Sequence, residues 1–343
     1  MFVCQFHLQL RENLLTCSCR QMLGQLAYWY VATIPQKIIM DKQHLNICTY
    51  NCRSAKNSFS KLSELCNICD ILLLQEHWLL PFELNLLNNI NPDFCSHGSS
   101  AVDTSSGILV GRPYGGTACL YRKDLAAGIK PVPSTNSRIS ALTLSTSCGS
   151  LLLINVYMPT NYGDNDSLEL YIECLTYLHA IIVDSNAVHT VVAGDFNCSV
   201  GFRLFTEFKE FVADNNFVAS DLIRLDNVST YVSDDGQKLS WVDHIISSPT
   251  ADIMLLYVNV LENFVMSDHR PLIFSLQCSI TLPTAPDEWV KPIEDVRLAN
   301  WNACCDERLS SYAEYLDCTL QHNYFCTSLS ASESMCSSRY CCH

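Results

Sequence analysis

Val191-Val-Ala-Gly-Asp-Phe-Asn197 is the stretch of sequence that decides the fold. It begins with apolar and β-branched residues of strand composition and ends in a turn with an acid and an amide. A second stretch, Ser267-Asp-His-Arg-Pro271, stands directly before the apolar run Leu272–Leu276. In both stretches, residues able to bind metal or move protons border a predicted buried strand.

The same arrangement recurs outward from these stretches. Strand composition is found at Leu45–Tyr50, Asp70–Leu74, Gly116–Tyr121, Ile139–Ser145, Leu151–Tyr157, Thr190–Ala193, Ser240–Ile246, Val258–Val260 and Pro271–Leu276. Helical periodicity is found at Ser58–Asn67, Ser167–Asp184 and Phe205–Asn215. Many strands, few helices and frequent turns predict an α+β fold, a two-layer β-sandwich flanked by helices.

Polar residues at the ends of these strands are the candidate site. They are Asn51, Glu76, Tyr157, Asp195, Asn197, Asp243, Asp268 and His269. Strands that end at one edge of a sandwich would bring these side chains together. Carboxylate and amide oxygens are the ligands that a hard divalent cation prefers, and the histidine with the remaining carboxylates could transfer protons.

The chain divides into regions of different composition. Residues 1–44 form an N-terminal extension without a motif, and residues 45–280 form the domain that holds the candidate site. Prolines predict a linker at 281–300, which is followed by one helix at 301–320. Residues 321–343 are a Cys/Ser-rich tail that we predict to be unstructured.

Composition limits the classes of function. Of the 343 residues, 48% are hydrophobic and 16% charged, which predicts a globular chain. The net charge of −14 argues against binding nucleic acid by bulk positive charge, because phosphate binding depends on Lys and Arg. It does not exclude a nuclease, since a cluster of metal-binding carboxylates is itself acidic.

The 20 cysteines indicate reduced thiols in an intracellular protein, because they are scattered through apolar runs and no signal peptide is visible. Cys66-Asn-Ile-Cys69 is interpreted as two thiols near the end of a buried helix, in preference to a redox or zinc site. No apolar run reaches the roughly 20 residues that span a bilayer, so we expect no membrane association.

Six motifs in order resemble those of the endonuclease/exonuclease/phosphatase superfamily. They are Asn51, Gln75-Glu76, Tyr157-Met-Pro159, Gly194-Asp-Phe-Asn197, Val242-Asp-His-Ile245 and Ser267-Asp-His-Arg-Pro271. The resemblance spans about Leu45 to Leu276 and implies the DNase I-like, four-layer α/β-β/α arrangement. Glu76-His-Trp-Leu79, Gly115-Gly-Thr-Ala-Cys-Leu120 and Thr230 upstream of Asp243 are most similar to the apurinic-type endonuclease domain of LINE-type (non-LTR) retrotransposon polyproteins.

The resemblance implies a role for each residue. Glu76 and Asn51 would hold Mg²⁺ or Mn²⁺, and Asp268 would support the metal or the geometry of the histidine. His269, oriented by Asp243, would stabilise the transition state at the phosphate. Asp195 would align or deprotonate the attacking water. The remaining assignments are a hydrogen bond from Tyr157 and substrate contacts by Asn197, Thr230 and Ser267.

The implied function is nicking of DNA to leave a 3′-hydroxyl and a 5′-phosphate, as in target-primed reverse transcription. The sequence has no Tyr/Phe-x-Asp-Asp motif of a polymerase, which predicts a truncated element without reverse transcriptase. DNA is the expected partner, with no stable protein partner. The substrate implies the nucleus, with the cytoplasm as the alternative compartment.

One residue departs from the family pattern. Members specialised for abasic sites usually carry a carboxylate two residues after the first asparagine, and here that residue is Arg53. The departure removes a possible metal ligand and favours the retrotransposon branch over abasic-site repair. Alternatives are the same fold acting on an inositol phosphate, sphingomyelin or RNA, and an inactive retrotransposon remnant.

Several neighbouring residues have two interpretations. His244 is expected to be a packing or hydrogen-bonded residue. His77 and Trp78 either pack or, for the tryptophan, line a DNA groove. The Asn161-Tyr162 loop either contacts DNA or is simply solvated. Asp164 and Asp166 are expected to cap the helix that begins near Ser167.

Overall fold

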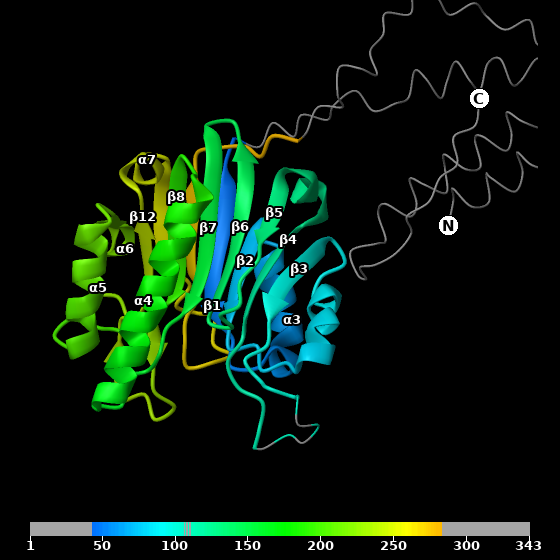
Figure 1. Ribbon diagram of the computed structural model, residues 1–343. Coiled ribbons are helices and arrows are strands. Elements are labelled where there is room, and N and C mark those ends of the chain that lie inside the picture. Colours follow the sequence, from blue (N-terminus) through cyan, green and yellow to red (C-terminus); the bar gives the residue numbers. More distant parts are fainter. Residues whose placement is uncertain (1–42, 106, 108, 110, 283–343) are drawn as a thin grey trace, which may run out of the picture. The chain divides into compact units, whose positions relative to one another are not determined.

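The structure is a computed structural model that describes residues 43–282 apart from 106, 108 and 110 (Figure 1). The described residues belong to one compact unit. The predicted N-terminal extension before residue 43, the linker beyond residue 282, the helix at 301–320 and the tail at 321–343 lie outside the described residues. Those regional boundaries therefore stay predictions.

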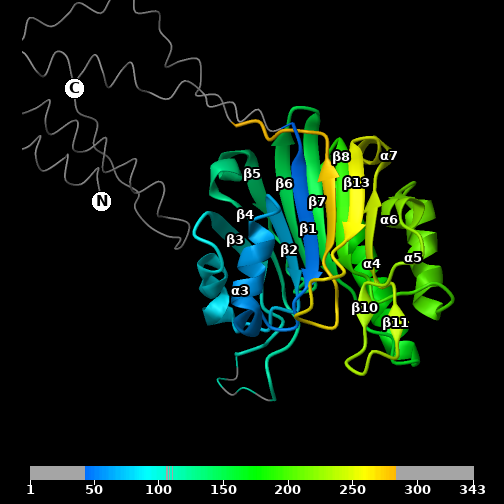
Figure 2. The ribbon, with the colours of Figure 1, turned by 180° about the vertical axis from the view of Figure 1, so that it is seen from behind.

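The first sheet, sheet A, has six strands in which β1 and β2 run parallel and all other neighbours are antiparallel. In spatial order they are β13 (Leu255–Val260), β14 (Leu272–Leu276), β1 (Leu45–Asn51), β2 (Ile71–Gln75), β4 (Thr117–Arg122) and β3 (Phe94–Ser99). The parallel pair is central, and Figure 2 shows β1 and β2 behind helix α3 (Ala55–Cys66), which connects them.

The second sheet, sheet B, has the same design, with β7 and β8 as its parallel pair. In spatial order its strands are β5 (Ile129–Val132), β6 (Ile139–Thr146), β7 (Gly149–Tyr157), β8 (His189–Asp195), β12 (Asp243–Ser247) and β9 (Val218–Ala219). A separate two-stranded hairpin consists of β10 (Tyr231–Val232) and β11 (Leu239–Ser240).

Helices connect the strands and cover the outer faces of the sheets. Besides α3, they are α4 (Asn165–Ser185), α5 (Arg203–Asp214), α6 (Ser220–Arg224), α7 (Pro249–Asp252) and the 3-10 helices η1 (Pro81–Asn89) and η2 (Lys123–Gly128). The predicted cap of α4 is present: Oδ1 of Asp164 accepts a hydrogen bond from the backbone N–H of Ser167 at 2.8 Å.

The apolar core lies in three layers. Ile47, Leu73, Leu153 and Phe274 belong to the layer between the sheets. A second layer packs sheet A against α3 and η1, and a third packs sheet B against α4 and α5. The two ribbon views agree, with α3 on one side of the sandwich and α4 and α5 on the other (Figures 1 and 2). The predicted helix-flanked sandwich is therefore confirmed.

The central strands have continuous apolar runs because both of their faces are covered. In β7, Leu151 and Leu153 face the layer between the sheets, while Leu152 and Ile154 face α4 and α5. Successive side chains of a strand point to opposite faces, so a strand covered on both sides needs apolar residues throughout. Eight of the ten described cysteines are also buried, Cys66 and Cys69 among them, and the ten form no disulfide.

Parts of the predicted secondary structure were wrong or incomplete. The predicted strand Ser240–Ile246 is two elements, β11 and β12, separated at Trp241-Val242. Edge strands β3 and β5 were not predicted. The β3 sequence Cys-Ser-His-Gly lacks β-branched residues, and β5 contains Pro131, which is tolerated because β5 pairs with β6 alone.

Candidate active site

Most of the candidate residues lie where parallel strands end. Asn51 ends β1 opposite Gln75, the last residue of β2. In sheet B, Tyr157 ends β7 opposite Asp195, the last residue of β8, and Asp243 begins β12 on the other side of Asp195. Parallel strands end at the same edge of their sheet, so each sheet presents a row of polar residues at one edge.

Asn51 connects the two rows through its side-chain amide. Its Nδ2 donates to Oε1 of Glu76 at 2.9 Å and to Oδ2 of Asp195 at 3.0 Å. Its Oδ1 accepts from the backbone N–H of Arg53 at 3.3 Å. Asn51 and Asp195 are each only 1% exposed. The structure thus brings Glu76, which follows β2 in sheet A, next to Asp195 of sheet B.

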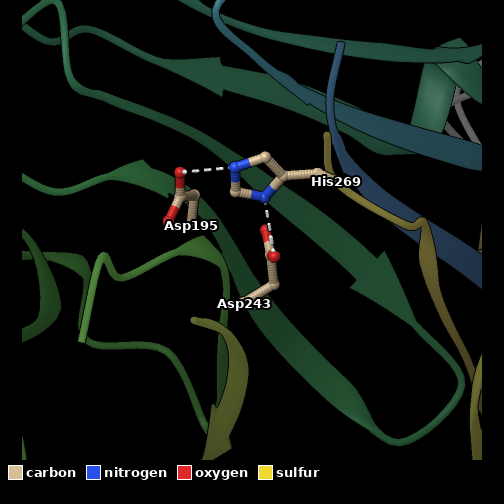
Figure 3. Close-up of side chains that lie close together, drawn as sticks. All are labelled: Asp195, Asp243 and His269. Atoms are coloured by element: carbon tan, nitrogen blue, oxygen red, sulfur yellow. Dashed lines mark hydrogen bonds and ion pairs between the residues drawn. The ribbon is translucent and has the colours of Figure 1, made fainter. Parts of the chain in front are cut away.

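His269 lies between two buried carboxylates (Figure 3). Its Nδ1 is 2.9 Å from Oδ2 of Asp243, and its Nε2 is 3.7 Å from Oδ2 of Asp195. Because an ionised carboxylate only accepts hydrogen bonds, Nδ1 carries the hydrogen toward Asp243. Nε2 is therefore the ring atom directed toward Asp195.

The protonation states in this cluster depend on one another. Burial alone would lower the pKa of His269, but the negative charges of Asp243 and Asp195 and the hydrogen bond to Asp243 together raise it to about 10. Burial raises the pKa of Asp195 to about 7, although the positive charge of His269 acts in the opposite direction. Near neutral pH, His269 is thus a cationic donor and Asp195 is close to the point where it accepts a proton.

Thr230 and Ser267, two of the three predicted substrate contacts, hold candidate catalytic side chains in place. The Ser267 hydroxyl donates to the backbone carbonyl of Asn51 at 2.7 Å and accepts from the backbone N–H of His269 at 2.9 Å. Thr230 is fully buried, and its Oγ1 accepts from the backbone N–H of Asp243 at 3.0 Å and of the preceding residue at 3.1 Å. Both hydroxyls therefore position the His269–Asp243 pair.

Asn197 is held beside Asp195 by a tight turn. Its backbone N–H donates to Oδ1 of Asp195 at 2.9 Å, and its Nδ2 donates to the carbonyl of Met158 at 2.8 Å. Its φ of 49° lies in the left-handed region, which asparagine adopts more readily than most residues. The turn brings the side chain of Asn197 to the same edge as Asp195.

Tyr157 lies close to both acids and to a cation. Burial, followed by the charges of Glu76 and Asp195, raises the pKa of Tyr157. The phenol therefore stays neutral and remains a hydrogen-bond donor. The guanidinium of Arg138 lies 5.1 Å from the centre of the tyrosine ring and donates to the Tyr157 carbonyl at 3.3 Å.

Asp268 stands beside the cluster and faces Arg53. Its Oδ2 is 3.2 Å from Nη1 of Arg53, which also donates to Oδ1 of Asp234 at 3.0 Å. The charge of Asp268 still contributes to the raised pKa of His269. The predicted metal-supporting carboxylate is thus paired with a guanidinium.

The loop after β2 fixes Glu76. Nε1 of Trp78 donates to Oε2 of Glu76 at 2.9 Å, and both residues have positive φ angles, 54° and 52°. The buried His77 between them accepts from the N–H of Leu79 through Nδ1 and donates through Nε2 to the carbonyl of Ser99. Because burial lowers the pKa of His77 to about 4, this histidine is neutral, and its two hydrogen bonds hold the loop in place.

These residues fall within the region where the chain matches a protein family. The sequence model of the endonuclease/exonuclease/phosphatase family matches residues 48–269, which is more than half of the chain.

The chain belongs to this family.

No curated protein is significantly similar to it in sequence.

Several solved structures are similar in fold. The 3′ phosphatase NExo from Neisseria, bound to a product DNA hairpin, has 19% identity, a TM-score of 0.54, and coverage of 68% of this chain and 99% of that one. The AP endonuclease LMAP from Leishmania major has 17% identity and a TM-score of 0.56, and the match covers 68% of this chain and 87% of that one. The endonuclease domain of TRAS1, a telomere-specific non-LTR retrotransposon, has 13% identity and a TM-score of 0.52, and the match covers 68% of this chain and 98% of that one. At such identities, the likeness shows the fold alone.

The chemistry of the donor set at this edge of the family fold fits a hard divalent cation. Glu76 offers two carboxylate oxygens, and Asn51 offers an amide oxygen, which accepts from the Arg53 N–H at 3.3 Å and keeps a second lone pair. A carboxylate has about four lone-pair sites, so Glu76 keeps acceptor capacity beyond its bonds to Asn51 and Trp78. The pKa of Asp195, raised first by burial, indicates buried negative charge that a cation would balance.

The histidine cluster is a second place that could hold a metal ion. Ligand atoms of Asp195, Asp243 and His269 all lie within 4.8 Å of one another. Here, however, Nδ1 of His269 is bonded to Asp243, and the pKa of about 10 keeps Nε2 protonated as well, so neither ring nitrogen has a lone pair for a metal ion. The oxygen donors of Glu76 and Asn51 are therefore the better set for a hard cation.

Sequence reasoning missed two groups of supporting residues. Asn155 donates from sheet B to the carbonyls of Leu74 and Ala118 in sheet A, and Gln75 donates to its Oδ1 at 2.6 Å. A lone polar residue in the apolar run of β7 was a signal for this contact. Asp221, which bonds His244 at 2.8 Å, has no motif and could not have been found.

Among the described residues, no helix has the length and apolar character needed to cross a membrane.

Proposed function

We propose that this chain is a divalent-cation-dependent endonuclease that nicks DNA and leaves a 3′-hydroxyl and a 5′-phosphate. Membership of the family supports a hydrolase acting on phosphoester bonds. The observation that carries the proposal is the Asn51 amide, which bonds both Glu76 and Asp195 beside the His269–Asp243 pair. A cation site and a proton-transfer site thereby share one edge of the sandwich.

Glu76 and Asn51 are the residues that we assign to the cation. When bound, the cation would supply neutralisation of phosphate charge and stabilisation of the leaving oxygen. Trp78 and the neutral His77 keep Glu76 in its strained conformation, so the carboxylate is placed before the cation arrives.

Asp195 and Asn197 are the residues that we assign to the attacking water. Asp195 accepts a proton from the water, and its raised pKa of about 7 makes it a competent base near neutral pH. The Asn197 turn next to it orients the water or a phosphate oxygen. Because Asp195 and the side chain of Asn197 are each held by a backbone contact, the water meets preformed polar groups.

His269 and Tyr157 are the donors that we assign to the phosphate. His269 is cationic and is oriented through Nδ1 by Asp243, so Nε2 can donate to a phosphate oxygen as negative charge accumulates. The neutral phenol of Tyr157 adds a second donor. In this proposal Thr230 and Ser267 position the pair and do not touch substrate.

A role in retrotransposition deepens this proposal. The Glu76-His-Trp-Leu79 string and the position of Thr230 support the LINE-type branch, in which the nick exposes a 3′-hydroxyl for reverse transcription. The fold is shared with the endonuclease domain of TRAS1. DNA in the nucleus is then the substrate. The fixed cations at the edge, Arg53 and Arg138, would offset part of the chain's acidic charge near the phosphates.

A plasmid assay tests the proposal. The full chain is incubated with supercoiled plasmid and Mg²⁺ or EDTA, and conversion to open circles is measured. We expect nicking only with Mg²⁺, and its loss in Glu76→Gln and His269→Ala. Glu169→Gln and His179→Ala, on the exposed side of α4, are matched controls that should nick normally.

The chemistry of the nick is tested on the same products. DNA ligase should reseal the open circles, because it requires a 3′-hydroxyl and a 5′-phosphate, and a polymerase should extend them. Open circles that neither enzyme accepts would contradict the proposed products. Hydrolysis of a phosphoinositide, sphingomyelin or RNA by a folded chain that leaves the plasmid intact would replace the proposed substrate.

A further inference from the structure

Arg53 forms a clasp between two acids at the catalytic edge. Its Nη1 lies 3.2 Å from Oδ2 of Asp268 and 3.0 Å from Oδ1 of Asp234, in the turn of the β10–β11 hairpin. The side chain of Asp268 is 16% exposed, against 78% for that of Asp234. The more buried of the two acids is the one that belongs to the Ser267–His269 loop.

The backbone aims Arg53 at these acids. Arg53 has a φ of 45° and Ser54 a φ of 113°, both unusual for residues with a side chain. The N–H of Ser54 donates to the carbonyl of Glu76 at 2.9 Å, and that of Ala55 donates to the carbonyl of His77 at 3.0 Å. The strained turn is therefore tied to the loop that carries Glu76.

The charge of Arg53 acts on Glu76 as well. The hydrogen bond that Arg53 donates to Asp234, then the charges of Asp268, Asp234 and Glu76, raise the pKa of Arg53. A guanidinium is always protonated in proteins. The edge thus contains a fixed positive charge next to the acids that would otherwise attract a divalent cation.

We propose that Arg53 withdraws Asp268 from the cation ligands, so that Glu76 and Asn51 hold the cation without it. This rests on the proposed cation site. The guanidinium pairs with the carboxylate of Asp268, and its positive charge repels a second cation from the side of the site where Asp268 lies. The carboxylate of Asp268 then acts on His269 through its charge and does not serve as a ligand.

Arg53 could instead contact a DNA phosphate. Two carboxylates already pair with the same nitrogen of its guanidinium, so a phosphate would have to displace one of them. Asp234 is also held in place by the hairpin that carries it, where the N–H of Ser233 donates to the carbonyl of Lys238 at 2.9 Å. The geometry thus favours the clasp, and the phosphate contact becomes an outcome of the test.

Mn²⁺ binding tests the proposal directly. Free Mn²⁺ is measured by electron paramagnetic resonance during titration of the full chain, without DNA. We expect Arg53→Ala and Arg53→Gln to bind Mn²⁺ on the order of five- to tenfold more tightly than the unmodified chain, or to take up a second ion, because Asp268 is released and a repelling charge is removed. Arg53→Lys should stay near the unmodified chain.

Two controls separate Asp268 from general electrostatics. The double variant Arg53→Ala/Asp268→Asn should return to the affinity of the unmodified chain. Lys56→Ala removes a cation that pairs with Glu83, and it should change the affinity less than twofold. Circular dichroism and thermal unfolding establish that each variant is folded.

Three results would overturn the proposal. The first is equal Mn²⁺ binding by the unmodified chain and by folded Arg53→Ala and Arg53→Gln, including no binding by any of them. The second is a gain that persists in the double variant. The third is unchanged Mn²⁺ affinity with a raised KM for DNA, which would assign Arg53 to a phosphate. Plasmid nicking by the unmodified chain is measured separately, so failure of the clasp is distinct from failure of the proposed function.

Discussion

His269 and His244 form similar pairs in two regions of the molecule. Each bonds an aspartate through Nδ1: Asp243 at 2.9 Å for His269, and Asp221 at 2.8 Å for His244. Asp243 and His244 are neighbours on β12, so their side chains point to opposite faces of sheet B. One pair therefore lies at the edge that holds the candidate site, and the other lies behind it.

The two histidines differ in the contact of Nε2. In His244 it donates to the carbonyl of Cys198 at 3.0 Å, and the ring stacks on Phe208 with centroids 5.0 Å apart. In His269 it points toward Asp195 at 3.7 Å. A histidine committed at both nitrogens stabilises the fold, whereas one with a loosely engaged nitrogen can serve a reaction. An Asp–His pair alone does not distinguish the two.

His269→Ala should cause the largest effect. We expect the nicking rate to fall on the order of 10³-fold, because a cationic donor at the phosphate is lost. The melting temperature should also fall, because buried Asp243 loses its partner. Rates come from the plasmid assay and melting from circular dichroism, with His179→Ala as the control. A loss of less than tenfold would break the contrast between the histidines.

His244→Ala should cost stability and largely spare the reaction. The unfolding free energy should fall by about 3–5 kcal/mol, because Asp221 is left buried without its partner. Below the melting temperature, the nicking rate should fall less than tenfold. Denaturant titration measures the first quantity. The double variant Asp221→Asn/His244→Gln should recover much of the stability, and if it does not, the pair is not what His244 contributes.

Only part of this contrast could be predicted from sequence. The ordered motifs predicted a catalytic role for His269. His244, next to Asp243, was expected to pack or to form hydrogen bonds. The partner of His244 could not be predicted, since Asp221 lies in the five-residue helix α6 without a motif. Burial of the strands was predictable from their apolar runs, whereas the edge strand β3 was not.

Side-chain geometry was the part of the site that sequence could not provide. The motifs placed Asn51, Glu76 and Asp195 at strand ends, but only the packing of the sheets shows that one amide bonds both acids. Likewise, Arg53 is visible as a departure from the family pattern. Its contact with Asp268 depends on the strained turn at Arg53 and Ser54.

The pH dependence of the unfolding free energy tests whether the buried Asp195 costs the protein stability. Folding raises the pKa of Asp195 from 3.8 to about 7, so between these values the folded state binds more protons than the unfolded state. The stability contributed by this residue therefore falls as pH rises through that interval. The Asp195→Asn variant has no carboxyl group to titrate at this position, so it does not lose this stability as pH rises.

Unfolding of the two proteins in EDTA at pH 5 and pH 8 measures the effect. The stability of Asp195→Asn relative to the unmodified chain should increase on the order of 2 kcal/mol between the two conditions. Its nicking activity should be lost at both. A relative stability that does not change with pH would show that Asp195 is not held at a destabilising position.

Thr230 variants should give the smallest effect. Thr230→Val removes the acceptor for the Asp243 N–H and should cost about 1–3 kcal/mol. Its kcat should fall moderately while KM for DNA is unchanged, and Thr230→Ser should restore both stability and kcat. A raised KM with unchanged stability would instead support the substrate contact predicted from the sequence.

The central claim is that both sheets contribute to one cation-assisted site, with Glu76 and Asn51 as the cation ligands. Anomalous diffraction from Mn²⁺-soaked crystals tests it most directly. We expect the strongest peak at the carboxylate of Glu76, on the edge shared with Asp195 and His269. A peak bound by Asp243 and His269 with none at Glu76, or no peak at this edge, would contradict the account.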